Sequence, residues 1–205
     1  MMELITPQRR RLADVLDGLS PAQWQAPTLC AGWTAGHVLA HLTMPFRIST
    51  AEFMAGLASS GGDFTAYSDA IAERDSGLPQ ARLAGLLRDN AGNPWAPPGG
   101  GLAGALSHDL IHGLDVTWPQ GMTSWADPAA LTAVLGMVAG GGEQRSVFGF
   151  SLAGLRLQAS DLDWAAGGGE PLAGRGRDLL LLIAGRRLPR DLFSGPGAQR
   201  LPDAA

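Results

Sequence analysis

The stretch "AGWTAGHVLAHL", residues 31–42, places His37 and His41 four residues apart in a segment whose apolar residues have helical spacing. Thr34 lies where that helix would begin and is a typical N-cap residue. Residues i and i+4 of a helix lie on the same face, with Cβ atoms about 5–6 Å apart. The stretch therefore predicts an apolar helix that presents two imidazoles on one face.

A second histidine pair has the same spacing. The stretch "ALSHDLIHGLDV", residues 105–116, contains His108 and His112, so that all four histidines of the chain belong to two such pairs. Antiparallel helices of a bundle bring facing side chains into one core site, and three imidazoles beside one open position are typical of catalytic zinc sites. Taken alone, the spacing fits a divalent-metal site and equally fits ordinary core and surface histidines.

The composition narrows the classes of partner. Hydrophobic residues make up 45% of the 205 residues, and the net charge is −4. The chain therefore has enough apolar side chains for a core and lacks the positive footprint of a nucleic-acid or membrane-surface protein. Cys30 is the one cysteine, which excludes an internal disulfide. We expect a cytoplasmic protein, because the sequence shows neither a signal peptide nor a membrane-spanning apolar run. The expected partner is a small-molecule substrate, and the expected assembly is a monomer or a homodimer.

Helical spacing recurs through the first two thirds of the chain. The pattern predicts helices over residues 7–19, 34–57 with a kink at Pro45, 78–91, 102–118 and 127–141. Residues 64–77 are more polar and fit either one more helix or a connection.

The pattern changes in the last third of the chain. Leu155, Leu157 and Ala159 alternate with polar residues, as in a half-buried strand. The following stretch "GEPLAGRGRDLLLLIAGRRL" is typical of a short strand and then a buried helix. We therefore expect a helical bundle over residues 1–145 and a small α/β region over residues 146–205.

A longer pattern surrounds the first histidine pair. Residues 16–42, "LDGLSPAQWQAPTLCAGWTAGHVLAHL", resemble the N-terminal signature of DinB-like metal-binding helical bundles, in particular the branch of the mycothiol-dependent maleylpyruvate isomerases. The matching residues are Trp24, Pro27, Thr28, Cys30, Gly32, Trp33, Ala40, His41 and Leu42. The stretch "HDLIHGLDV" is similar to a later helix of that family through His108, His112 and Asp115, and residues 155–186 are similar to the C-terminal α/β part of the branch.

The resemblance implies a mainly α fold, with an up-and-down four-helix bundle followed by a small α/β C-terminal region. It carries the metal ligands of the family onto His41, His108 and His112. Zinc is the expected divalent ion and nickel is possible, because three imidazoles suit several such metals. The chain departs from the isomerases at His108, where they tend to have glutamate, and at Gly113, where they tend to have arginine.

The resemblance also implies a low-molecular-weight thiol as co-substrate. The chain has arginine without lysine and is rich in glycine and alanine, which is typical of an actinobacterial source, where that thiol would be mycothiol. The leading interpretation is a metal-dependent enzyme that uses the thiol for S-transfer to a small electrophile or for its isomerisation. Metal-dependent hydrolysis and non-catalytic binding of a metal or small ligand stay open as alternatives.

Three further residues lie near the expected ligands in the sequence. Asp115 either orients a ligand imidazole through its second ring nitrogen or caps and pairs elsewhere on the surface. Asp109 is expected to be solvated. Cys30 has no basic neighbour in the sequence, so a buried packing role is expected in preference to a reactive thiol.

Three further side chains are weaker candidates for contact with a cofactor or substrate. His37 is expected near the site without being a ligand, either bonded to a ligand or substrate or exposed at the helix start. Arg47 either steers an anionic substrate or is an ordinary surface arginine. Trp33 is expected to be a core residue in preference to a substrate platform.

Overall fold

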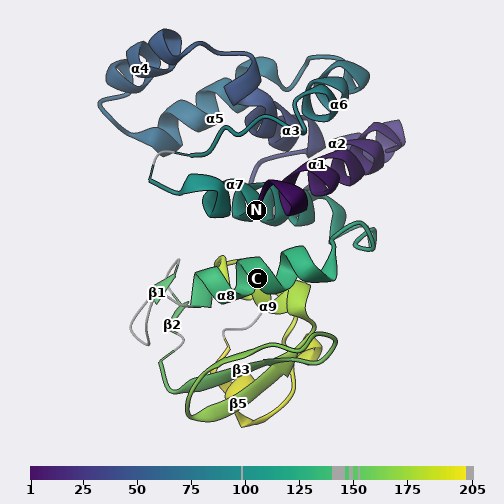
Figure 1. The fold of residues 1–205 in the computed structure, drawn as a ribbon, viewed down its shortest axis with the longest axis vertical. Coiled ribbons are helices and arrows are strands. Elements are labelled where there is room, and N and C mark those ends of the chain that lie inside the picture. The colour runs from purple at the N-terminus through teal and green to yellow at the C-terminus, as the bar shows by residue number, and fades with distance from the viewer. Residues whose placement is uncertain (98, 140–145, 148–149, 152, 202–205) are drawn as a thin grey trace. The chain divides into compact units, whose positions relative to one another are not determined.

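The computed structural model describes residues 1–97, 99–139, 146–147, 150–151 and 153–201 (Figure 1). The chain divides into two compact units, Met1–Ala126 and Asp127–Ala205. The boundary that the sequence predicts near residue 145 lies outside the described residues. The helix α8 (Pro128–Ala139), which precedes that predicted boundary, belongs to the second unit, because it packs against the helix α9 (Gly176–Ile183) of that unit.

The N-terminal unit is built from helices. They are α1 (Met2–Asp17), α2 (Pro21–Gln25), α3 (Ala35–Thr43), the 3₁₀ helix η1 (Met44–Phe46), α4 (Thr50–Ser59), α5 (Phe64–Asp75), α6 (Gln80–Asp89) and α7 (Gly101–Thr117). None of the described helices of the chain has both the length and the apolar character needed to cross a bilayer.

Four of these helices form the bundle that the sequence predicts. α1 packs against α6 and α7, and α3 packs against the same two helices (Figure 1). Leucines at helical spacing fill the space between them, and Leu12, Leu39, Leu83 and Leu110 are fully buried. The mainly α fold with a four-helix bundle is thus confirmed.

The first helix begins earlier than predicted. α1 starts at Met2, so that Pro7 lies inside the helix and not at its start. Proline inside a helix removes one backbone hydrogen bond. Packing of the first turns offsets that loss, because Ile5 is fully buried and the Gln8 side chain donates a hydrogen bond to the Trp125 carbonyl oxygen at 3.2 Å.

The expected kinked helix over residues 34–57 is two helices. α3 ends at Thr43, and α4 begins only after Ser49. Ser49 and Glu52 form a capping box, in which Glu52 N donates to Ser49 Oγ at 3.2 Å and Ser49 N donates to Glu52 Oε2 at 2.8 Å. This local pattern starts a new helix, and the polar segment that follows it is the helix α5.

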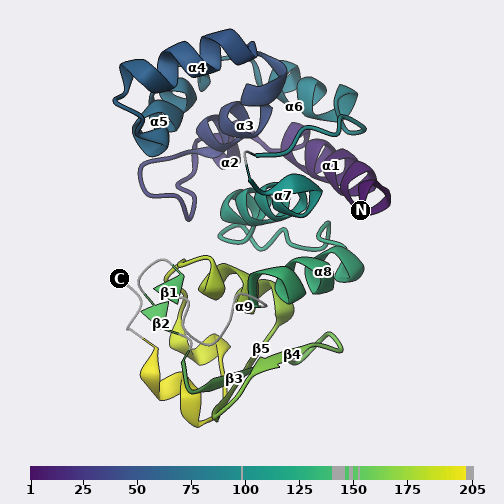
Figure 2. The same cartoon turned by 60° about the vertical axis from the view of Figure 1, so that its left-hand side comes forward.

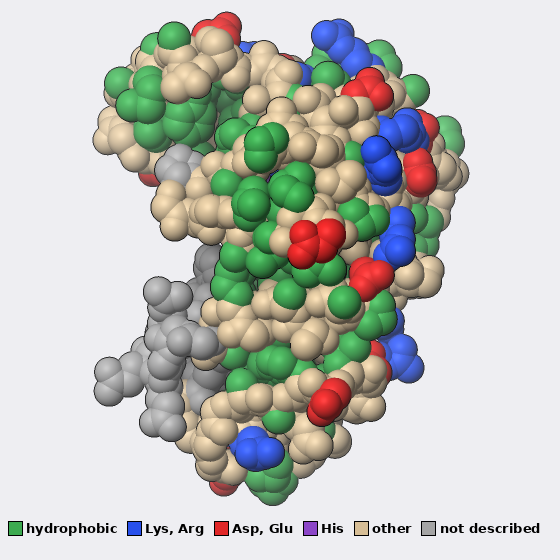
Figure 3. All heavy atoms as spheres, in the orientation of Figure 1, with side chains coloured by type: hydrophobic (Ala, Val, Ile, Leu, Met, Phe, Trp, Pro, Cys, Tyr) green, Lys and Arg blue, Asp and Glu red, His purple; other side chains and the backbone are tan. Residues whose placement is uncertain are grey.

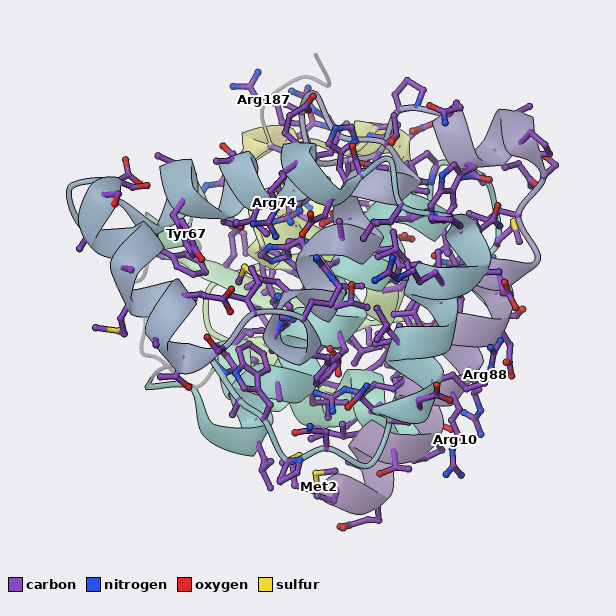
Figure 4. The ribbon with its side chains drawn as sticks, turned by 90° about the horizontal axis from the view of Figure 1, so that it is seen from above. Met2, Arg10, Tyr67, Arg74, Arg88 and Arg187 are labelled. Carbon is purple, nitrogen blue, oxygen red and sulfur yellow. The ribbon has the colours of Figure 1, made fainter. Side chains whose placement is uncertain are left out.

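α4 packs on α5 through aromatic side chains. Phe53 and Tyr67 meet edge to face, with ring centroids 5.5 Å apart, and Tyr67 extends from α5 towards α4 (Figure 4). The outer surface of this pair remains apolar, with Met54 57% exposed and Phe64 46% exposed. Figure 3 shows hydrophobic side chains gathered over this region, at the upper left.

The second unit has the small α/β region that the sequence predicts. Its elements are α8 (Pro128–Ala139), β1 (Ser146–Val147), β2 (Phe150–Ser151), β3 (Leu155–Ala159), β4 (Ala165–Gly167), β5 (Glu170–Gly174), α9 (Gly176–Ile183), and the 3₁₀ helices η2 (Arg190–Leu192) and η3 (Pro196–Arg200).

The central strand β3 lies between β4 and β5 (Figure 2). It pairs antiparallel with β4 and parallel with β5, where Leu157 is in register with Leu172. Both leucines are buried, and the predicted alternation along β3 is confirmed because Leu155, Leu157 and Ala159 are its buried positions. α8 packs against α9, which explains why it is grouped with this unit.

Candidate metal centre

Three of the four histidines meet inside the N-terminal unit. His41 comes from α3, whereas His108 and His112 lie one turn apart on α7, which packs against α3. His41 is buried and the other two are partly exposed. The ring centroid of His41 is 4.8 Å from that of each partner, and the His108 and His112 centroids are 5.0 Å apart.

The nitrogen donors of these rings are close enough to hold one ion. One ring nitrogen from each histidine lies within 4.8 Å of the others, and His41 Nε2 and His108 Nε2 are 2.8 Å apart. A tetrahedral zinc ion with Zn–N bonds of about 2.0–2.1 Å separates its nitrogen ligands by roughly 3.3 Å. The donor set therefore fits a divalent ion with small adjustments of the side chains.

The charge state of the innermost ring also suits a ligand. Burial, and after it the neighbouring His108 and His112, lowers the pKa of His41 to about 2. His41 is therefore neutral at physiological pH, as a metal-binding imidazole has to be. The cluster thus needs no proton release from His41 before it can bind an ion.

Two of the rings have an oxygen partner on the nitrogen that points away from the cluster. His41 Nδ1 is 2.8 Å from Ser68 Oγ, and His112 Nδ1 is 3.0 Å from Asp115 Oδ2. Such partners fix the tautomer and orientation of metal-binding histidines. Asp115 is fully buried, so the first interpretation of this residue, an orienting partner, matches its position better than a surface cap does.

Asp109 is not solvated, contrary to expectation. It is 3% exposed and accepts a hydrogen bond of 2.7 Å from Nε of Arg9, which is itself 1% exposed. Its other oxygen, Oδ1, is 3.7 Å from His108 Nδ1. The prediction failed because the compensating arginine lies 100 residues away in the sequence and meets Asp109 only in the folded bundle.

Cys30 lies directly beside the centre. Its Sγ donates to Asp115 Oδ2 at 3.1 Å and is 3.8 Å from His112 Nδ1. The thiol is half-buried, which agrees only in part with the expected packing role. Cys30, His112 and Asp115 have donor atoms within 4.8 Å of one another, so this loop contributes to the surroundings of the His112 ring.

Two tryptophans flank the cluster. The Trp33 ring lies 5.4 Å from the His41 ring and 6.5 Å from the His112 ring, and the Trp95 ring lies 6.0 Å from the His108 ring, measured between centroids. Both tryptophans are half-buried, so Trp33 is not the core residue that the sequence suggests. Trp95 and Ser68 carry no motif that links them to the centre, and sequence reasoning missed both.

His37 is separate from the three-histidine cluster. Its Nδ1 accepts a hydrogen bond from Thr34 N at 3.2 Å, and its Nε2 is 2.9 Å from Glu73 Oε2. Both ring nitrogens are thus engaged at the start of α3. The position fits the interpretation of a residue near the helix start that is not a ligand.

Arg47 is held inside the protein and does not face outward as a steering charge. Its guanidinium donates to Asp75 and to the Ala40 carbonyl oxygen, and its Nε donates to Thr43 Oγ1 at 3.3 Å. Asp75 also accepts two hydrogen bonds of 2.7 Å from Arg74, a residue of α5 that is labelled in Figure 4. The hydrogen bonds among Arg47, Asp75 and Arg74 therefore connect the end of α3 to the end of α5.

Replacement of Asp75 by asparagine is expected to flatten the acid limb of the stability profile. Hydrogen bonds from Arg74, and then from Arg47, hold the pKa of Asp75 below its ordinary value. The contribution of this carboxylate is fully present above about pH 4, the pKa of an unfolded aspartate, and is lost as pH falls through the lower folded pKa. Thermal unfolding measured across this pH range should show that the wild type loses stability more steeply with acid than the variant does. Equal slopes in the two proteins would contradict a lowered pKa of Asp75 in the folded protein.

Packing explains why position 113 is a glycine. A Cβ at this position would lie 2.4 Å from Trp125 Cη2 and 2.9 Å from Leu12 Cδ1. Trp125 is buried, and its Nε1 donates to Thr117 Oγ1 at 2.9 Å. In this chain the indole therefore occupies the space into which a longer side chain at position 113 would extend.

Part of the chain matches a known protein family. Residues 5–93 match the model of the mycothiol maleylpyruvate isomerase N-terminal domain. The likeness is to the N-terminal domain of that family, and it covers less than half of the chain. The resemblance in the sequence is thus confirmed. His41 lies within the matched residues, whereas His108 and His112 lie after residue 93, where the match ends.

Solved structures extend the likeness to the second unit. Two crystal structures of mycothiol-dependent maleylpyruvate isomerase, one of them a histidine-to-alanine mutant, have TM-scores of 0.62 (the mutant) and 0.61. The identities are 16% and 15%, and each match covers 100% of this chain and 94% of the other. No curated protein sequence matches the chain. At these identities the solved structures establish the shared fold of the chain.

Proposed function

We propose that this protein is a divalent-metal-dependent enzyme that uses a low-molecular-weight thiol of the mycothiol type. The reaction is S-transfer to a small electrophile or isomerisation of that electrophile. The observation that carries the proposal is the convergence of His41, His108 and His112 in a chain with the fold of a thiol-dependent isomerase. Zinc is the first candidate for the ion, and nickel is the second.

The chain's own residues account for binding of the ion. The three imidazoles supply the ligands, and Ser68 and Asp115 keep the outer ring nitrogens of His41 and His112 engaged. A divalent ion held there supplies Lewis acidity, which favours the thiolate form of a thiol bound beside it. The rings of the half-buried Trp33 and Trp95 lie beside the same place, 5.4 Å from the His41 ring and 6.0 Å from the His108 ring.

Turnover assays with and without thiol test this proposal. The zinc-loaded full-length protein is given a reactive electrophile such as 1-chloro-2,4-dinitrobenzene or monochlorobimane, together with mycothiol, glutathione or no thiol. We expect turnover that requires both the thiol and the metal, and mycothiol should be the best of the thiols. Maleylpyruvate, tested in parallel, separates isomerisation from S-transfer.

The other outcomes identify the alternatives. Hydrolysis of ester or amide substrates without any thiol would replace the proposal with a metal-dependent hydrolase. Tight metal binding without turnover under any of these conditions would leave a binding protein that retains the fold. A His112→Ala variant with undiminished thiol-dependent turnover would separate the chemistry from the histidine cluster.

A further inference from the structure

His108 differs from the other two histidines in the surroundings of its outer nitrogen. His41 Nδ1 has Ser68, and His112 Nδ1 has Asp115. His108 Nδ1 is buried and has no hydrogen-bond partner among the described residues. Asp109 Oδ1 lies 3.7 Å from it. Buried polar atoms are nearly always satisfied, so this nitrogen requires an explanation.

Ligation determines where the proton of His108 has to be. His41 Nε2 and His108 Nε2 face each other at 2.8 Å, so at least one of these nitrogens lacks a proton. An ion bound by both rings through Nε2 requires both Nε2 atoms to be unprotonated, and each neutral ring then carries its proton on Nδ1. For His108 that places an N–H donor at the buried nitrogen, where an acceptor is needed.

Asp109 is fixed in a position from which it can accept a hydrogen bond from this N–H group. Arg9 Nε donates to Asp109 Oδ2 at 2.7 Å, and the side chains are 1% and 4% exposed. Arg9 is held in turn by a bond of 2.7 Å from Nη1 to the Asn93 carbonyl oxygen. This pair occupies Oδ2, while Oδ1 is the oxygen on the side of His108. A shift of roughly 0.7 Å brings Oδ1 to ordinary hydrogen-bond distance.

We propose that Asp109, held by Arg9, is the positioning residue of His108. Its Oδ1 accepts the Nδ1–H of the ring and thereby fixes the tautomer and orientation in which Nε2 faces His41 and His112. The inference rests on the metal centre of the proposed function. It also gives the buried ion pair a role, since such pairs usually contribute little to stability compared with apolar side chains of similar volume.

Zinc affinity of an Asp109→Asn variant tests the inference. An amide at this position lacks the carboxylate charge and offers Nδ1–H a weaker acceptor. Competition with a chelating dye should show binding about 10–100-fold weaker than in the wild type, the usual effect of losing an outer partner of a ligand histidine. The matched control is Asp75→Asn, which removes another buried carboxylate paired with arginine and should leave zinc affinity unchanged.

A spectroscopic readout separates positioning from a general loss of stability. In the zinc-loaded wild type the Nδ1–H proton of His108 should appear as a downfield, slowly exchanging resonance in ¹H–¹⁵N spectra. In Asp109→Asn it should exchange rapidly, while the His112 resonance stays unchanged. If Asp109→Asn does not fold, an Arg9→Met/Asp109→Leu double variant replaces the pair with apolar side chains and should show the same loss of affinity and of the resonance.

The outcomes distinguish this inference from the proposed function. Wild-type protein that binds neither zinc nor nickel would overturn the metal centre itself and the inference with it. Wild-type protein that binds zinc, with unchanged affinity and an unchanged His108 resonance in the Asp109 variants, would overturn only the role of Asp109.

Discussion

A His112→Ala variant is expected to lose its divalent metal almost completely, from about one equivalent in the wild type to close to none. The remaining pair of imidazoles, His41 and His108, leaves an ion with two protein ligands, whereas catalytic zinc sites use three. The substitution also removes one of the hydrogen-bond partners of buried Asp115, which still accepts from Cys30 Sγ. Elemental analysis of untagged protein, after reconstitution with zinc or nickel and dialysis, measures the effect directly.

His37→Ala provides the matched control for this experiment. His37 belongs to the other histidine pair of the sequence, but its ring nitrogens contact Thr34 and Glu73. Its loss should therefore leave the metal content unchanged, apart from a small decrease in stability from the weakened start of α3. Equal metal loss in both variants would indicate nonspecific binding by histidines, and retention of metal in His112→Ala would exclude the proposed centre.

Gly113→Ala is expected to destabilise the protein, although alanine is the better helix former by about 1 kcal/mol. The new Cβ would lie 2.4 Å from Trp125 Cη2, and the indole is held by packing and by its bond to Thr117. Overpacking of a rigid core site costs typically 1–3 kcal/mol. A net loss of about 1–2 kcal/mol should lower the unfolding temperature by several degrees, as measured by calorimetry.

Gly85→Ala is the control with the opposite expected sign. Gly85 lies within α6 of the same unit, and a Cβ at this position meets nothing within 4 Å. The substitution should stabilise the protein by about 0.5–1 kcal/mol through helix propensity alone. If both variants shifted the unfolding temperature in the same direction, packing against Trp125 would not be the reason for glycine at position 113.

The sequence predicts the bundle because its apolar residues recur with helical spacing, and the three histidines that the family resemblance names do lie together. His108 and His112 share a face of α7 simply through their spacing, and His41 joins them because α3 packs on α7. The boundaries of the helices are less predictable. The start of α4 was readable from the serine and glutamate of its capping box, but the apolar spacing on either side of Pro45 obscured it.

The surroundings of the ligands could not be predicted because they are set by contacts distant in sequence. Asp109 depends on Arg9, at a separation of 100 residues, and His41 depends on Ser68 of α5. Arg47 looks like a surface residue in the sequence, yet Asp75 and the Ala40 carbonyl oxygen hold it inside the fold. The pattern of charge and hydropathy along the chain does not predict which charged side chains will be buried together.

The placement of His41 and His108 on two helices has a consequence for folding. The two rings meet across a separation of 67 residues, so an ion shared between them would act as a removable cross-link that closes a long loop of the chain. For a permanent cross-link of that span, the chain-entropy model gives about 4 kcal/mol of stabilisation. Because a bound ion stabilises the folded state by mass action, the size of this stabilisation would depend on the concentration of free metal. Metal limitation would therefore reduce the persistence of the folded protein as well as the proposed activity.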